Sequence, residues 1–181
     1  MRRAFPLALL VLTGCASTPP GSALPGRDET ARVTDAGGNA LRFRPGEAAA
    51  RTTLAVPRDA AWRVLPAVYD SLGIPVTLID PATHTFGNSG FTLTRRLGKT
   101  SLTQYIDCGQ TQGFASAETY EIYLGVITQL HPGPDPGTTV MATSVDAAGR
   151  PMTFQGGYTR CSSKGELEKR IAERMGAAVN R

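Results

Sequence analysis

Strand-forming residues occupy every second position from 121 to 130. This is the period of a strand that is buried on one face. Seven residues rich in Pro and Gly follow at 131–137, and a similar pattern returns from 138 to 147. The sequence therefore predicts a long hairpin. Shorter runs predict further strands at 52–56, 76–79, 91–94 and just before Cys161, while the stretch 97–108 fits either a strand or irregular structure.

Two segments show the 3.6-residue period of amphipathic helices. The first begins with Asp59 as its predicted N-cap and ends at Gly73. The second begins with Ser163 and Glu166, which have the spacing of a capping box. The predicted core faces are Ala61, Leu65, Val68 and Leu72 in the first helix, and Leu167, Ile171 and Met175 in the second.

The predicted strands cluster between these two helices, which favours an α+β fold. We expect a single antiparallel sheet with two helices packed on one face. This domain covers residues 51–176, and residues 177–181 form a C-terminal tail. Trp62 and Tyr69 lie beside the core face of the first helix and are interpreted as core residues. The alternative is that they line a pocket between helix and sheet.

The N-terminus has the form of an export signal. Arg2 and Arg3 precede a short apolar run that is too short to span a bilayer. The run ends in Leu12-Thr13-Gly14-Cys15, which resembles the lipobox of bacterial lipoproteins. The resemblance implies cleavage after residue 14 and lipidation of Cys15 by groups such as palmitate. The alternative is an ordinary signal peptide in which this cysteine is incidental.

The residue after the cysteine is Ala16 and not Asp. By resemblance to Gram-negative lipoproteins, this favours the outer membrane, with the domain facing the periplasm. Residues 15–50 contain many Pro, Gly and Ser residues and are interpreted as a lipid-anchored flexible tether. Within the tether, residues 33–35 and 40–43 flank two glycines. They fit plain linker, with a small hairpin or a segment that orders only on a partner as the alternatives.

Composition excludes several classes of protein. No apolar run reaches 18 residues, so the chain is not a polytopic membrane protein. The formal net charge is +4, and loss of Arg2 and Arg3 with the signal leaves 17 basic against 15 acidic residues. This near balance and the export signal argue against a nucleic-acid partner.

Cys108 and Cys161 remain once Cys15 carries lipid. An even pair in an oxidising compartment predicts a disulfide. Free thiols or metal ligands are the alternatives. Neither cysteine belongs to a CxxC motif, and both histidines lie far away in sequence, so we expect no metal site and no cofactor.

No set of residues has the spacing of a catalytic site. His84 and His131 are predicted to be solvated loop residues. Residues 87–90 lack the spacing of a nucleophile elbow and predict a turn. Residues 109–113 lack the Lys-Ser/Thr ending of a phosphate-binding loop and predict a loop beside Cys108. The sequence therefore predicts a protein that is not an enzyme.

Part of the chain is similar to the repeated domain of the BamC (NlpB) lipoproteins of the outer-membrane β-barrel assembly machinery. The similarity rests on Ala61-Trp62 in the first helix, Leu72-Gly73, the strand after Pro75, Asp80 and the Phe-Gly pair at 86–87. It covers about 30 residues plus the lipobox and implies a helix-grip fold.

The similarity implies no catalytic residues. We therefore expect an accessory protein–protein interaction module of an envelope complex. The alternative function is a carrier that binds a hydrophobic small molecule or lipid between helix and sheet.

Overall fold

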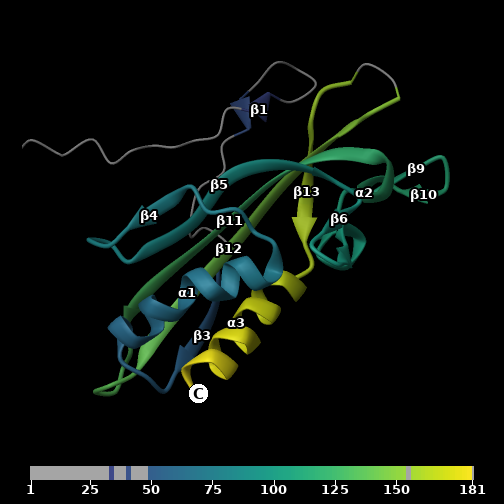
Figure 1. Ribbon diagram of the computed structural model, residues 1–181. Helices are drawn as coiled ribbons and strands as arrows, with labels where there is room; N and C mark the ends of the chain where they lie inside the picture. The colour runs from purple at the N-terminus through teal and green to yellow at the C-terminus, as the bar shows by residue number, and fades with distance from the viewer. Residues whose placement is uncertain (1–32, 35–39, 42–48, 154–155, 181) are drawn as a thin grey trace, which may run out of the picture.

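A computed structural model describes the backbone at 33–34 and 40–41 and all atoms of residues 49–153 and 156–180. These parts combine helices with antiparallel strands (Figure 1). In chain order the elements are β1 (Val33–Thr34), β2 (Ala40–Leu41), β3 (Ala50–Leu54), α1 (Arg58–Leu72), β4 (Leu78–Asp80), β5 (Thr85–Thr94), β6 (Arg96–Leu97), β7 (Thr100–Ser101), η1 (Leu102–Gln104), β8 (Ile106–Asp107), β9 (Gln110–Thr111), β10 (Phe114–Ala115), α2 (Ser116–Thr119), β11 (Tyr120–Pro132), β12 (Thr139–Pro151), β13 (Thr159–Ser163) and α3 (Glu166–Val179).

The main sheet has seven strands, in the order β4-β5-β11-β12-β13-β8, with β3 paired to β12. All of these pairs are antiparallel. The hairpin of β11 and β12 forms its centre, with a register that runs from Tyr120 opposite Pro151 to Pro132 opposite Thr139. The predicted hairpin is confirmed, and both of its strands are longer than expected. Two-stranded sheets lie beside the main one, so the single sheet of the prediction is incomplete.

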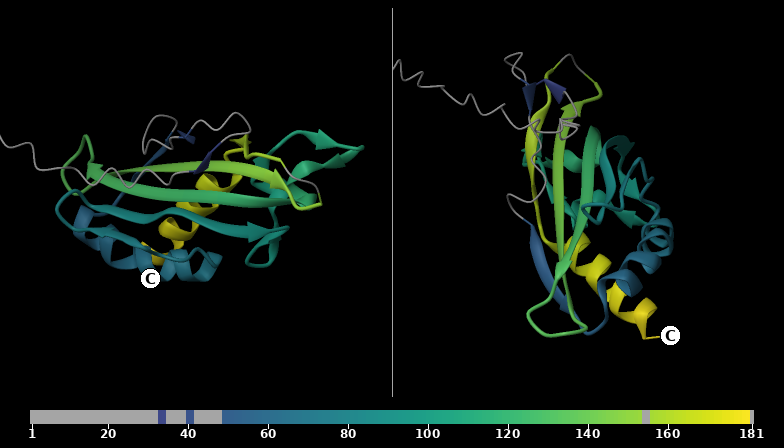
Figure 2. Two further views of the ribbon diagram at one scale, coloured as in Figure 1. Left: turned by 90° about the horizontal axis from the view of Figure 1, so that it is seen from above. Right: turned by 90° about the vertical axis from the view of Figure 1, so that its left-hand side faces the viewer.

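Helices α1 and α3 lie on the same face of this sheet (Figure 2). The face is apolar because alternate residues of β11 point toward the helices, as the period-2 pattern predicts. Burying each aliphatic side chain of this row contributes about 1.5–3 kcal/mol to stability. The inward residues of β11 are Ile122, Leu124, Val126, Thr128 and Leu130, and all are at most 1% exposed.

The helix ends differ from the predicted caps. Helix α1 begins one residue before Asp59, with Pro57 as N-cap, because proline already holds the extended backbone that this position needs. The predicted capping box is wrong. Ser163 ends β13, its hydroxyl donates to the Glu168 carboxylate at 2.6 Å, and left-handed Gly165 is the N-cap of α3. Helix α3 continues to Val179, through most of the predicted tail.

The turn predicted at residues 87–90 is also wrong, because these residues lie inside β5. The register between β5 and β11 shifts there, so that Ser89 and Gly90 together face Gly125 in a β-bulge. Gly87 has a φ of 151°, and a Cβ on it would overlap the carbonyl oxygen of Val126. Glycine is therefore required by the close approach of two strands.

The N-terminal strands β1 and β2 pair with each other, Val33 opposite Leu41 and Thr34 opposite Ala40. These pairs fall within the two segments for which a small hairpin is one alternative to plain linker. Among the described residues, three α-helices are present, and none of them is long and apolar enough to cross a membrane.

Candidate functional site

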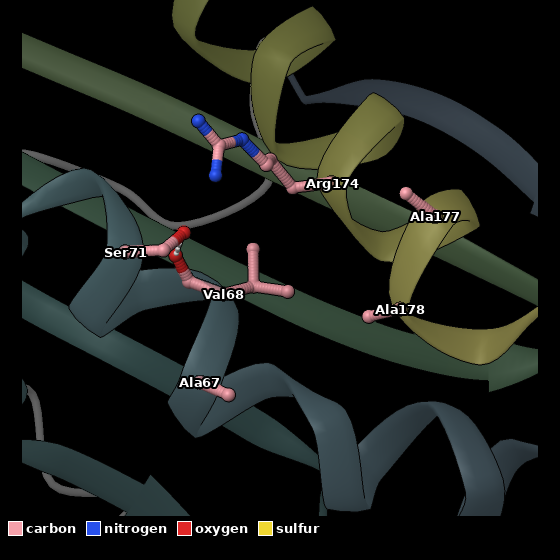
Figure 3. Close-up of a pocket in the computed structure, with 6 residues that line it drawn as sticks. All are labelled: Ala67, Val68, Ser71, Arg174, Ala177 and Ala178. Atoms are coloured by element: carbon pink, nitrogen blue, oxygen red, sulfur yellow. Dashed lines mark hydrogen bonds between the residues drawn. The ribbon is translucent and has the colours of Figure 1, made fainter. Parts of the chain in front are cut away.

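A groove of about 170 Å³ lies on the outer side of the helix layer, between α1 and α3 (Figure 3). It exists because both helices present small side chains where they approach each other. Ser71 and Arg174 lie at one end of the groove, and Ala67 and Ala178 lie toward the other. The full lining is Ala67, Val68, Ser71, Arg174, Ala177 and Ala178.

The groove has little chemistry of its own. The Ser71 hydroxyl donates to the carbonyl of Val68 at 2.7 Å, within its own helix. Within the described part of the chain, no acceptor or carboxylate contacts the guanidinium of Arg174. The groove therefore combines a surface lined mainly by small side chains with one cation and one hydroxyl.

Tyr69 lies in the packed core and not on the wall of this groove. Its ring meets that of Phe86 edge-on, at 5.1 Å between centroids, and Phe86 also contacts half-buried Trp62 at 5.8 Å. The Tyr69 hydroxyl is 2.9 Å from Thr128 Oγ1, which is 2.9 Å from Thr143 Oγ1. Trp62 and Tyr69 thus come together around Phe86, in a layer that joins α1 to the sheet, as their interpretation as core residues predicts.

We expect Tyr69→Phe to lower the free energy of unfolding by about 1 kcal/mol, because it removes a buried hydrogen bond while Thr128 keeps Thr143 as a partner. Burial raises the pKa of the Tyr69 hydroxyl well above its ordinary value. In the unfolded chain the Tyr69 hydroxyl ionises near pH 10. In the folded chain the same hydroxyl stays protonated at that pH. Stability should therefore be complete below about pH 10 and fall as the pH rises beyond it.

Urea titrations at pH 7 and at pH 11 measure both effects of this substitution. The phenylalanine variant should lose less stability between the two pH values than the wild type does. An equal loss of stability in both proteins would contradict the raised pKa of the Tyr69 hydroxyl in the folded state.

His84 is not the solvated loop residue of the prediction. Its side chain is 15% exposed, and its ring lies edge-on to Trp62 at 5.4 Å. Nε2 is 3.6 Å from a carboxylate oxygen of Asp59, while Nδ1 is buried without a hydrogen-bond partner. The backbone is left-handed, with a φ of 52°. His131 is exposed, as predicted, and brings no second group to this position.

The disulfide between Cys108 and Cys161 is confirmed. It joins the end of β8 to β13, two strands that also pair directly. Beside it, Gln112 and Gly113 both have positive φ and connect β9 to β10. Positive φ at both central residues is the requirement of a type I′ hairpin turn. The loop predicted beside Cys108 is therefore a short, well-defined hairpin.

The remaining site predictions have different outcomes. Cys15 lies outside the described residues, so its lipidation stays a prediction. No cluster of three His, Cys, Asp or Glu side chains able to hold a metal ion exists in residues 49–153 and 156–180. The groove was not predicted. Its one signal in the sequence is spacing: Ala67 with Ser71, and Arg174 with Ala178, are four residues apart and therefore neighbours on a helix surface.

No family model matches the chain, and no curated protein matches it at a significant level of similarity. The similarity to BamC lipoproteins rests on the residues quoted above and stays a prediction.

Proposed function

We propose that this chain is a lipoprotein of the outer membrane whose periplasmic domain binds another envelope protein and catalyses no reaction. The observation that carries the proposal is the disulfide between Cys108 and Cys161. Disulfides persist in oxidising compartments, which is where a lipobox at Cys15 would send the chain. The disulfide and the lipobox both support the proposed location outside the cytoplasm.

A binding role is favoured over a carrier role by the packing between helix and sheet. A carrier needs an apolar cavity there. In this chain the ring of Phe86 and the hydroxyl of Tyr69 fill the space between α1 and the sheet centre. The free surfaces are outside, at the α1–α3 groove and at the sheet edge. We propose in addition that the helix layer and sheet form a helix-grip arrangement similar to that of BamC.

The test is to purify the full-length lipidated protein from native membranes in a mild detergent and identify what accompanies it. A stoichiometric envelope complex, absent when Cys15→Ser is used as bait, is the expected result. Native mass spectrometry of the same sample tests the alternative function, a carrier that binds a hydrophobic small molecule or lipid. A lone protein that carries a lipid-sized mass would replace the binding role with the carrier role.

A further inference from the structure

Half of strand β5 has an open outer edge. On one side β5 pairs with β11 along most of its length. On the other side β4 covers only residues 85–87. Among the described strands, none pairs with Ser89–Thr94 on that outer side. Ser89 and Gly90 belong to the β-bulge, and the Gly90 amide is held by Asn88 Oδ1 at 2.8 Å, so the regular part of the edge is Phe91–Thr94. Strands of about three to ten residues are usual, so this edge has room for a short added strand.

The side chains of this edge alternate in a way that suits an added strand. Phe91 and Leu93 lie opposite buried Leu124 and Ile122, and both pack partly buried against the core. Thr92 points to the other face. A strand laid beside β5 would place its own alternate residues against the exposed parts of the two apolar side chains. Such pairing draws affinity from backbone hydrogen bonds and specificity from alternate side chains.

Three cations follow the open edge directly. Arg95, Arg96 and Lys99 are exposed, and no carboxylate lies within 4 Å of any of them in the described part of the chain. Glu121, which faces the end of β5, is already held by Arg150 at 2.6 Å. The cations at this end of the edge therefore lack a negative partner.

Arg95 also has an unusual backbone conformation. Its φ is 61°, in the left-handed region that glycine or asparagine adopts with less strain. A long charged residue at such a position costs stability, of the order of 1 kcal/mol. Arg95 ends the extended part of β5, and its carbonyl accepts the amide of Leu102, which fixes the turn.

We propose that the outer edge of β5 at Phe91–Thr94 binds an extended segment of a protein partner as an added antiparallel strand. In an antiparallel pair, the N-terminal residues of the added segment lie beside the C-terminal end of β5. The partner segment therefore has acidic residues at its N-terminal end, opposite Arg95, Arg96 and Lys99, and alternating apolar residues after them. This inference rests on the proposed binding function and names the surface and the partner chemistry.

The test uses the full-length oxidised protein in detergent and a synthetic octapeptide with three N-terminal acidic residues followed by alternating valine and threonine. We expect saturable binding that weakens with added salt. Arg95→Glu/Arg96→Glu should weaken binding about tenfold. The matched control, Arg51→Glu/Lys169→Glu, makes the same change of charge away from this edge and should bind as the wild type does.

Hydrogen exchange separates strand addition from simple charge attraction. The bound peptide should slow amide exchange within Phe91–Thr94. Binding without protection there, or an equal loss in the control variant, would overturn the proposal. Sedimentation that shows a dimer which the peptide cannot dissociate would assign the edge to a second copy of the chain and overturn it as well.

The outcomes also separate this inference from the proposed function. A native complex that survives Arg95→Glu/Arg96→Glu unchanged would overturn the role of the edge and leave the binding function standing. Absence of any native complex, with the peptide bound and β5 protected, would refute the envelope-complex function and leave the edge as a strand-binding site.

Discussion

Replacing both Cys108 and Cys161 by serine lowers the free energy of unfolding by about 4 kcal/mol in the chain-entropy description of a disulfide. The two cysteines are separated by 53 positions, so the loop they close in the unfolded chain is long. Losing the bond frees that loop and raises the entropy of the unfolded state. A domain of this size has a total stability of only about 5–15 kcal/mol, so the loss is a large part of it.

Urea unfolding followed by circular dichroism measures this loss. The wild type treated with a reductant should move toward the stability of the double serine variant, while the variant itself should not respond to the reductant. A variant that unfolds at the same urea concentration as the oxidised wild type would contradict the prediction.

We expect Cys15→Ser to abolish the incorporation of labelled palmitate and to remove the protein from the outer-membrane fraction. The expected effect is close to complete, because the thiol is the only attachment point that a lipobox offers for the diacylglyceryl group. Two or more acyl chains, each contributing about 0.8 kcal/mol per buried CH₂, hold a protein on a bilayer far more firmly than one. Radiolabelling of growing cells, followed by membrane fractionation, measures both results.

The double serine variant at Cys108 and Cys161 is the matched control for this experiment. It also replaces cysteine by serine, but it should still incorporate palmitate. A wild-type chain that takes up no label would favour the ordinary signal peptide over the lipobox.

Sequence patterns predicted the centre of the fold well, because local periodicity and burial agree there. Strand β11 is inside the sheet, and its alternation from Ile122 to Leu130 corresponds to its buried face. Both long helices were also predicted, since their apolar spacing is a local signal. The disulfide followed from the even pair of cysteines together with the oxidising compartment that the export signal implies.

The wrong predictions occur where the same local sequence is compatible with two different structures. Residues 87–90 have the composition of a turn, yet two glycines are equally needed where β5 bulges and approaches β11. Ser163 has the spacing of a helix cap, but pairing of β13 with β8 extends the strand through it. In both cases the deciding partner is distant in sequence, so no local pattern contains it.

The candidate surfaces could not be predicted for a related reason. The α1–α3 groove depends on which faces of two helices meet, and the open edge of β5 depends on where β4 stops. His84 was wrongly predicted to be solvated, because the burial of a loop residue depends on residues that are distant in sequence. Its neighbours are Trp62 and Asp59, which belong to α1.

If the proposed lipid anchor holds the chain through residues 15–50, the position of β3 determines how the domain responds to mechanical tension. Any tension between a lipid anchor and the domain enters through β3, whose five residues, Ala50–Leu54, pair with β12. Peeling β3 away would expose an edge of β12 between Thr139 and Thr143 and the part of the core that Leu54 covers beside α3. Both long strands lie between Cys108 and Cys161, within a covalent loop. Tension can therefore detach the N-terminal strand while the loop that holds the hairpin cannot be drawn out.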